Sequence, residues 1–517
     1  MKYKTSPKAA LVSLGCPKNL VDSEVALGYL QKAGFTLTFD ESEADVLIVN
    51  TCSFIEDAKQ ESIETILELA EEKKKVPVRA RLLVVAGCLA QNFGEEILQQ
   101  IPEIDLLIGT GMVPVIGQVC REALDGKLTQ SVWIDEPTFL YTEKTPRTRA
   151  TLPHVAYVKI AEGCNNRCSY CLIPRLRGKL RSRTEDSIVA ECQDLARQGV
   201  KEINLIAQDT TAYGMDLPFS SSGTTDTTGF SDTSSSSGSV GHDRKDRLVS
   251  LLKRLVKVEG LHWIRLLYTY PDSISRELLE CMAEEPKICK YLDVPIQHIN
   301  DTILHAMNRR SSRKSIEDTF ALIREIIPDA IIRTSLMVGF PGEGKKQFEE
   351  LRDFVARAQF DRLGVFSFSP QEETPAARLA GKVSQKVKEQ RKDEILQLQA
   401  GISEQKNRKL IGTRQEVIID LIENGEENSA SGAGAADLAG PGGAAGAAGS
   451  AGSVCPGGAA GFAGTSVVIG RTAGHAPDID GIVYLPPAVH CAAGDIVPVR
   501  IVRAECYDLF AEFLSIG

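Results

Sequence analysis

Short apolar segments alternate with helical ones over about the first 140 residues, and this alternation constrains the fold most strongly. The strand-like runs are residues 9–14, 45–50, 82–86 and 105–108, and the helical ones are residues 21–33, 55–75 and 93–100. Apolar runs as continuous as residues 45–50 are typical of parallel strands buried on both faces. The pattern therefore predicts an open parallel α/β sheet with helices on each side.

Three cysteines follow three of these strands at equal intervals. Cys16, Cys52 and Cys88 are each 36 residues apart, which is about one strand and one helix. Because open α/β sheets bind ligands at the carboxyl ends of their strands, the three thiols are expected to converge on one metal site. The alternative is that each is a small buried apolar side chain.

A second series of strands and helices begins near residue 152. Its strands are predicted at residues 155–161, 202–207, 263–268, 291–294, 330–338 and 362–367. Six strands with intervening helices predict a partial (β/α) barrel whose chemistry lies at the carboxyl ends of the strands.

The remainder of the chain has a different pattern. Residues 384–411 form a long polar helix, expected to be a connector, and strand-like segments at 415–421, 466–471, 481–485 and 495–503 predict a small antiparallel β-barrel. Segments 219–243 and 424–465 consist mainly of small and polar residues, so we expect flexible insertions there. The predicted domains are residues 1–145, 150–400 and 403–517.

Cys164, Cys168 and Cys171 are packed into eight residues directly after the first barrel strand. Zinc in a structural site takes four protein ligands, and three neighbouring thiolates cannot supply them alone. Iron–sulfur clusters are bound by cysteine thiolates, usually four. A cluster held by three would leave one iron open to a substrate or cofactor.

Composition narrows the class of protein. The chain has 517 residues, 43% of them hydrophobic, thirteen cysteines and a formal net charge of −10. Without a predicted signal peptide, so many cysteines favour metal or redox chemistry over a disulfide framework. No apolar run is long enough to span a membrane, so a cytoplasmic protein is expected. The negative charge argues weakly against a surface built for nucleic acid.

Several other residues follow barrel strands and are candidates for binding a cofactor. Tyr170 could offer an aromatic face to an adenine, and the turn Val338-Gly-Phe-Pro-Gly-Glu343 could let backbone approach a ligand. Ordinary packing and an ordinary turn explain the same residues. Gln208 ends another strand, whereas His298 is expected to be a structural hydrogen-bonding residue.

A cationic run follows the second cysteine cluster. Residues 174–183, Pro-Arg-Leu-Arg-Gly-Lys-Leu-Arg-Ser-Arg, contain five cations. They are expected to neutralise a cofactor, a cluster or an acidic substrate, and Arg175 and Arg177 are hypothesised to steer that substrate. The alternative is a charged strand edge.

Taken together, these motifs resemble the radical S-adenosylmethionine (SAM) methylthiotransferases over nearly the whole chain. The similarity is carried by residues 13–24, Ser-Leu-Gly-Cys-Pro-Lys-Asn-Leu-Val-Asp-Ser-Glu, and by residues 162–179, which include the three clustered cysteines. It continues in Asp293-Val-Pro-Ile-Gln-His298, Gly470-Arg471, residues 476–481 and Tyr507-Asp508-Leu509. These segments are similar to the RimO branch, which modifies an aspartate β-carbon in a small-subunit ribosomal protein. A second branch modifies an adenosine in transfer RNA and remains the alternative.

The resemblance implies two 4Fe–4S clusters and SAM. Cys16, Cys52 and Cys88 would bind an auxiliary cluster, and Cys164, Cys168 and Cys171 the cluster that cleaves SAM. The implied SAM contacts are Tyr170, Gln208, Gly339, Pro341, Gly342 and Glu343, and the C-terminal barrel would be a TRAM domain. No further catalytic residue is assigned, and the other seven cysteines match no ligand position.

The implied chemistry joins a methylated sulfur from the auxiliary cluster to a substrate carbon radical. The carboxyl ends of both parallel sheets must then face each other. Implied partners are a small-subunit ribosomal protein or the assembled subunit and an electron donor such as flavodoxin or ferredoxin, with nucleic-acid contact secondary. An iron–sulfur electron carrier and a zinc scaffold are the rival classes.

Overall fold

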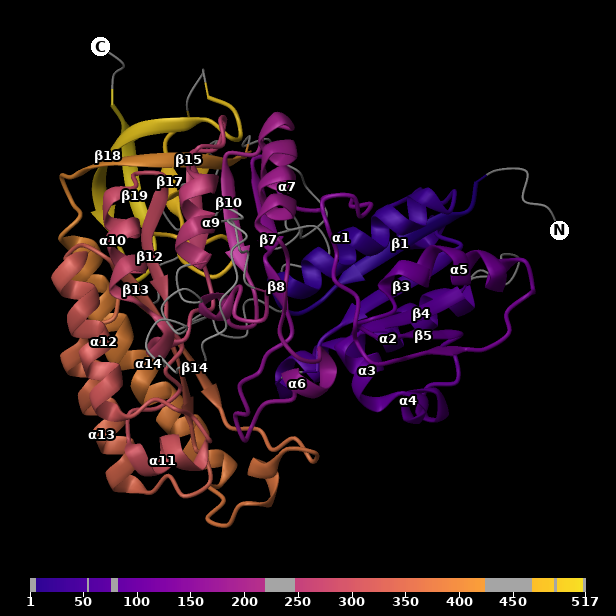
Figure 1. Ribbon diagram of the computed structural model, residues 1–517, viewed down its shortest axis with the longest axis horizontal. Coiled ribbons are helices and arrows are strands. Elements are labelled where there is room, and N and C mark those ends of the chain that lie inside the picture. The colour runs from indigo at the N-terminus through magenta and orange to yellow at the C-terminus, as the bar shows by residue number, and fades with distance from the viewer. Residues whose placement is uncertain are drawn as a thin grey trace, which may run out of the picture.

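The computed structural model describes residues 6–53, 55–75, 82–218, 247–423, 467–487 and 491–514. They form three adjoining regions, with the N-terminal sheet on one side of the barrel and the C-terminal strands at one end of it (Figure 1). The segments 219–243 and 424–465, together with Cys455, lie outside the described residues.

The N-terminal region is built on a six-stranded parallel sheet in the order β2-β1-β3-β4-β5-β6. Its strands are β1 (Lys8–Ser13), β2 (Thr36–Leu37), β3 (Val46–Thr51), β4 (Leu82–Gly87), β5 (Leu106–Ile108) and β6 (Val132–Trp133). Its helices are α1 (Pro17–Lys32), α2 (Glu56–Lys75), α3 (Cys88–Phe93), α4 (Glu95–Gln100) and α5 (Ile116–Leu124), with short 3₁₀ turns η1 (Glu41–Glu43) and η2 (Val113–Val115).

Alternate residues of each strand enter different cores because successive side chains point to opposite faces. Ile48 packs with α1 and α5, whereas its neighbour Val49 packs with α2 and α3. Helices therefore cover both faces of the sheet, as the apolar runs predicted. The carboxyl ends of the strands are left as the expected position of a functional site.

The central region contains a second parallel sheet, in the order β14-β13-β12-β11-β10-β7. Its strands are β7 (Val155–Lys159), β10 (Glu202–Ile206), β11 (Trp263–Leu266), β12 (Ile288–Asp293), β13 (Ile331–Val338) and β14 (Arg362–Ser367), beside a small ribbon of β8 (Ala161–Glu162) and β9 (Arg181–Ser182). The helices are α6 (Ile173–Leu176), α7 (Glu185–Arg197), α9 (Arg247–Leu255), α10 (Arg276–Glu284), α11 (Asp301–Ala306), α12 (Arg313–Ile326), α13 (Lys345–Ala358) and α14 (Gln385–Arg408), with η3 (Thr210–Ala212), η4 (Pro271–Ser273) and η5 (Pro375–Arg378). The six predicted strands are thus confirmed.

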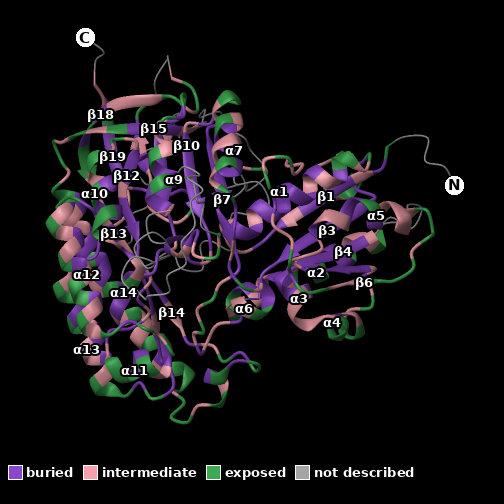
Figure 2. Ribbon diagram, in the orientation of Figure 1, coloured by how far each residue is buried: buried purple, intermediate pink, exposed green. Residues whose placement is uncertain are grey.

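Helix α14 does more than connect two regions. Its Ile395 and Leu396 join the main barrel core, and Gln399 donates a 2.8 Å hydrogen bond to the carbonyl of Phe360. The helix therefore covers the β14 side of the open sheet. Figure 2 shows the resulting arrangement, with buried strands inside and exposed residues on the outer surfaces of α12 and α13.

The C-terminal region is a closed five-stranded barrel in the order β15-β16-β17-β19-β18. The strands are β15 (Arg414–Glu423), β16 (Val467–Thr472), β17 (Val483–Leu485), β18 (Ile496–Ala504) and β19 (Leu509–Phe513). The small antiparallel barrel was predicted, but its fifth strand, β19, was missed.

A loop of the C-terminal barrel packs into the lumen of the central one. Arg471 donates to Glu202 over 2.8 Å, and Asp478 and Asp480 accept hydrogen bonds from the hydroxyls of Tyr157 and Tyr291 over 2.9 and 2.7 Å. Glu202 is the first residue of β10. The lumen is therefore filled from the amino ends of the strands, which leaves the carboxyl ends for chemistry.

Several predicted boundaries differ from the structure for local reasons. Helix α1 begins at Pro17 rather than residue 21, because Cys16 adopts an extended conformation and proline suits the first helical turn. Residues 93–100 were predicted as one helix but divide at Gly94, whose φ is +50°. Among the described residues, no helix is both long and apolar enough to cross a membrane.

Candidate functional site

Cys16, Cys52 and Cys88, here called the N-terminal triad, lie at the carboxyl ends of three adjacent strands. Strands β1, β3 and β4 are neighbours in the sheet, and each cysteine follows one of them. Burial and the nearby Cys16 thiol both raise the pKa of Cys88, and a Cβ atom on Gly15, next to Cys16, would lie 3.1 Å from Sγ of Cys52. The structure therefore brings together three thiols that are far apart in the sequence.

Two glycines allow the loops that carry the N-terminal triad to approach one another. A Cβ atom on Gly15 would lie 2.7 Å from the Cβ of Cys52, and one on Gly87 would lie 2.2 Å from Oδ1 of Asn50. Both glycines have φ values near +90°, a conformation that other residues rarely adopt. Asn19 completes the scaffold by donating to the carbonyls of Leu14 and Thr51 over 2.6 and 3.1 Å.

Cys164, Cys168 and Cys171, the central triad, occupy one loop after β8. The amide of Cys171 bonds the carbonyl of Cys168 over 3.1 Å, and the amide of Cys164 bonds that of Gly178. Asn166 donates to Asp209 at the end of β10 over 2.9 Å. The loop is thus fixed to the carboxyl end of the barrel, as expected.

The thiols of the central triad are partly buried. Burial raises the pKa of Cys164 to about 11 and that of Cys171 to about 12. Because metal ligation requires the thiolate, a bound cationic metal centre would stabilise the charged form that burial disfavours.

Neither triad encloses a single metal ion. Among the described residues, no three Cys, His, Asp or Glu side chains converge closely enough to do so. Thiolates that hold a four-iron cluster bind separate iron atoms, so they stand further apart than ligands of one ion. All six candidate donors in the two triads are cysteine thiols, the ligand type that iron–sulfur clusters take.

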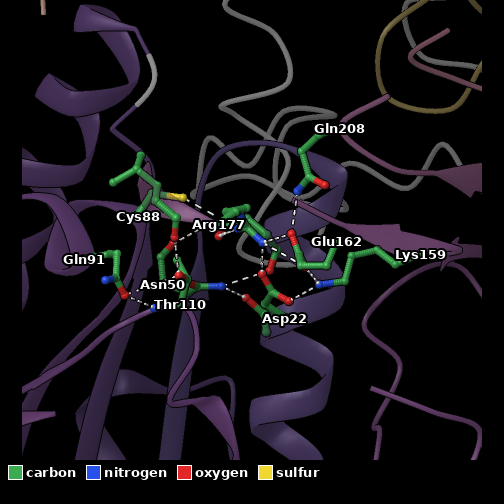
Figure 3. Close-up of polar contacts among 12 residues, drawn as sticks. Asp22, Asn50, Cys88, Gln91, Thr110, Lys159, Glu162, Arg177 and Gln208 are labelled. Carbon is green, nitrogen blue, oxygen red and sulfur yellow. Dashed lines mark hydrogen bonds and ion pairs between the residues drawn. The ribbon is translucent and has the colours of Figure 1, made fainter. Parts of the chain in front are cut away.

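A buried group of charged residues links the N-terminal region to the barrel (Figure 3). Nζ of Lys159 lies 2.5 Å from both Asp22 and Glu162, and Nη1 of Arg177 lies 2.7 Å from Asp22 and 3.3 Å from Glu162. We call Asp22, Lys159, Glu162 and Arg177 the bridging network. Asp22 belongs to α1, which begins after Cys16, and Glu162 precedes Cys164 by two residues.

The charges of the bridging network stabilise one another. Burial disfavours the ionised form of Glu162, but Lys159 and Arg177 outweigh burial and hold the pKa of that carboxyl well below its usual range. Burial also opposes the charge of Arg177, yet Asp22 and the nearby thiols raise its pKa. The carboxylate of Glu162 is therefore stabilised in its charged form by the two buried cations, Lys159 and Arg177.

Contacts across the gap confirm that the carboxyl ends of the two sheets face each other. The ammonium of Lys18 lies 2.7 Å from the ring centroid of Tyr268, which is the second residue after β11. Burial lowers the pKa of Lys18 to about 8. Tyr268 has a φ of +62°, a strained value of the kind that clusters at functional sites.

A second buried group fastens the domain linker to the same interface. Arg147 donates to Glu24 of α1 over 2.5 Å and to Glu191 of α7 over 2.6 Å, and Glu191 also pairs with Arg183. These pairs connect α1, the linker and the barrel.

The cationic run does not form one continuous basic surface. Arg177 and Arg183 are buried in ion pairs with carboxylates, while Arg175 is exposed and pairs with Glu373. Lys179 is exposed. The hypothesis that Arg177 steers a substrate is therefore wrong, because its guanidinium is already surrounded by protein groups.

The predicted SAM rim lies beside the central triad. The ring of Tyr170 packs edge-on against Phe340, with centroids 6.5 Å apart, and so belongs to an apolar cluster. Gly339 and Gly342 both have positive φ, and Pro341 is buried between them. The turn therefore requires its glycines, whatever ligand it meets.

The carboxylate of Glu343 stabilises that turn. It accepts a 2.7 Å hydrogen bond from the amide of Gly339 and a 2.8 Å bond from Arg391. Nε2 of His298 lies 3.7 Å away, and burial lowers the pKa of this imidazole to about 3. A neutral, buried His298 fits the structural role expected for it.

Gln208 joins the bridging network rather than standing apart from it. Its Nε2 donates to Glu162 over 2.5 Å, while its Oε1 is buried and has no hydrogen-bond partner in the described part of the chain. The same side chain thus carries an orphan acceptor and contacts Glu162, two residues before Cys164.

The other cysteines that the structure describes lie apart from both triads. Cys120, Cys192, Cys281 and Cys289 are buried, Cys491 is partly buried, and Cys506 is disulfide-bonded. The bridging network was the main feature that sequence reasoning missed. Charged residues on apolar elements were its signal: Asp22 on the buried face of a helix and Lys159 at the end of a buried strand.

Three family models match successive parts of the chain. The descriptions are Uncharacterized protein family UPF0004 over residues 8–109, Radical SAM superfamily over residues 158–355 and TRAM domain over residues 462–514. These matches cover most of the N-terminal sheet, most of the central barrel and the C-terminal strands after β15.

Curated relatives match along their full length. Ribosomal protein uS12 methylthiotransferase RimO from Geobacter sulfurreducens is 44% identical, covering 98% of this chain and 99% of that protein. The protein of the same name from Clostridioides difficile is 42% identical, with coverage of 98% and 99%. Among solved structures, the radical SAM methyltransferase TsrM from Kitasatospora setae aligns with a TM-score of 0.50 and 15% identity over 72% of this chain and 75% of that one, which supports the fold alone.

Proposed function

Because the chain belongs to the RimO family of radical SAM methylthiotransferases, we propose that it transfers a methylthio group to an aspartate β-carbon of ribosomal protein uS12. The chain is a transferase by family, and its relatives are named for action on that protein. One observation carries the proposal: two cysteine triads follow strands of separate parallel sheets, and the buried bridging network joins the two regions that carry them.

The family implies a 4Fe–4S cluster and SAM, and we propose a second 4Fe–4S cluster. Residues 150–400 would hold the first cluster at the central triad, and residues 1–145 the second at the N-terminal triad. When bound, these groups supply one-electron chemistry, a methyl group and sulfur. Each triad provides three thiolates, so one iron of each cluster has no cysteine ligand from it.

The protein itself positions the substrate side chain and excludes water. The bridging network fixes the N-terminal sheet against the barrel, so a substrate side chain entering the gap meets both centres in one orientation. The glycines of the turn at 339–342 let backbone approach SAM, and Tyr170, Gln208, Pro341 and Glu343 shape or support that side of the gap. The apolar packing around Tyr170 and Phe340 limits access of water.

The proposal extends to partners. The target is uS12, alone or within the small ribosomal subunit, which places the reaction in the cytoplasm. A reduced flavodoxin or ferredoxin supplies electrons. Residues 403–517, which include the C-terminal barrel, would contact the ribosomal partner, and contact with nucleic acid would be secondary.

A paired assay tests this function. Anaerobically reconstituted protein receives reductant, sulfide and SAM, with small ribosomal subunits in one sample and transfer RNA in the other. Mass spectrometry is expected to find a methylthio group on an aspartate of uS12 and unmodified nucleosides. Methylthiolated adenosine with unmodified uS12 would refute the proposed substrate and favour the transfer RNA branch.

A further inference from the structure

The guanidinium of Arg177 contacts both halves of the candidate site. Its Nη2 donates to Sγ of Cys88 over 3.6 Å and to Oδ1 of Asn19 over 3.1 Å. Its Nη1 donates to Asp22 over 2.7 Å and to Glu162 over 3.3 Å. One side chain on the central-triad loop therefore reaches a thiol of the N-terminal triad (Figure 3).

The surrounding structure holds the contact between Arg177 and Cys88 in place. Arg177 is 3% exposed and directly follows α6, and the carbonyl of Leu176 before it accepts a 2.6 Å hydrogen bond from Thr110 of the N-terminal region. Cys88 packs with Leu172 and Leu176. The guanidinium and the thiol are thus held together by packing on both sides.

A hydrogen bond and a positive charge at a ligand sulfur change the properties of a cluster. Both stabilise the more negative, reduced state and so raise the reduction potential. Arginine suits this position because its planar fork can bind carboxylates on one edge and sulfur on the other, whereas lysine is a point charge.

We propose that Arg177 is a positioning residue that orients the Cys88 thiolate and raises the reduction potential of the cluster at the N-terminal triad. The inference deepens the proposed function and rests on a second cluster being bound there. It gives a specific role to an arginine that sequence reasoning assigned to the substrate.

The test uses full-length protein in which Cys164, Cys168 and Cys171 are replaced by alanine, so that only the second cluster is reconstituted. In this background Arg177→Gln, Arg177→Lys, Asp22→Asn and the double variant Asp22→Asn/Arg177→Gln are compared. Electron paramagnetic resonance during a potentiometric titration gives the midpoint potential. Denaturant unfolding of the metal-free proteins measures stability independently.

Arg177→Gln is expected to lower the reduced-to-oxidised ratio at a fixed potential at least tenfold, about 59 mV for one electron. Arg177→Lys keeps the charge and should shift the potential less. The double variant restores the charge balance of the bridging network but lacks the guanidinium donor at Cys88, so its potential should also fall. Asp22→Asn retains that bond and should not lower the potential.

Lys179→Gln is the matched control, because Lys179 is an exposed cation of the same loop. Its potential should equal that of the parent. Loss of iron from a folded Arg177→Gln protein would also support the positioning role.

The inference fails if both Arg177→Gln proteins keep the parental potential while their stability falls, since Arg177 would then only fasten the domains. A parent that retains Arg177 but binds no cluster would refute the two-cluster proposal, and this inference with it. An intact second cluster with no effect of Arg177 would overturn the inference alone.

Discussion

The two triads differ in how the chain assembles them. The central triad lies within eight residues of one loop, whereas the N-terminal triad is collected from the ends of three strands spread over residues 16 to 88. The first depends on local sequence and the second on the folded sheet. Sites of the second kind should be more sensitive to changes in the scaffold.

The largest expected effects come from removing each triad in turn, because the two triads are assigned different chemistry. Replacing all three cysteines of the central triad with alanine should abolish both SAM cleavage and uS12 modification. Replacing the N-terminal triad should abolish methylthio transfer while SAM cleavage persists. Liquid chromatography of 5′-deoxyadenosine and mass spectrometry of uS12 measure the two outcomes. Continued methylthiolation without the N-terminal triad would contradict the assignment.

Gly87→Ala adds only one methyl group but should strongly disrupt the N-terminal triad. The added Cβ would lie 2.2 Å from Oδ1 of Asn50, and the φ of +90° disfavours any side chain. We expect a loss of about 2–4 kcal/mol of unfolding free energy, with iron lost from this site first.

Gly126→Ala is the matched control for that glycine. Its φ is +69°, but no atom lies within 4 Å of the added Cβ, so only backbone strain remains. Denaturant unfolding should show about 1 kcal/mol of destabilisation. Equal losses at both positions would show that crowding at the triad is unimportant.

The stability of the folded protein should depend on pH through His298, which lies beside Glu343 of the predicted SAM rim. Burial lowers the pKa of His298 to about 3, so the unfolded chain binds a proton below about pH 6.5 that the folded chain excludes. Stability should therefore fall as pH decreases between these values, by about 1.4 kcal/mol per pH unit for this group.

His298→Asn should reduce that slope by one proton, as measured by denaturant unfolding across pH. His305→Asn, at an exposed position, is the control for replacing a histidine with asparagine. An unchanged slope in His298→Asn would show that this imidazole is protonated when folded.

The smallest effect is expected at the exposed end of the cationic run. Arg175 and Glu373 form a solvent-exposed pair, so Arg175→Ala should change the unfolding free energy by less than about 1 kcal/mol. Thermal or denaturant unfolding measures it. A larger loss would mean that Arg175 supports the loop of the central triad.

Much of the fold follows from local patterns, but the contacts between regions do not. The apolar runs at residues 45–50 and 82–86 predict buried parallel strands, and the cysteines after them lie at the edge where open α/β sheets usually bind ligands. Strand β19 was missed because a five-residue segment near the end of the chain carries little periodic signal.

The bridging network was missed for a different reason. Asp22 and Arg177 are 155 residues apart, and their pairing depends on how two separately folded sheets dock. Seen locally, Arg177 is one cation in a basic run, which suggested a surface role. Only its burial against Asp22 and Cys88 assigns it to the interior.

Iron and sulfide analysis of anaerobically reconstituted protein tests the central claim most directly, because the account requires two clusters on two triads. It predicts about eight irons per wild-type chain and about four after alanine replacement of either triad. About four irons in the wild type, unchanged when the N-terminal triad is removed, would contradict it.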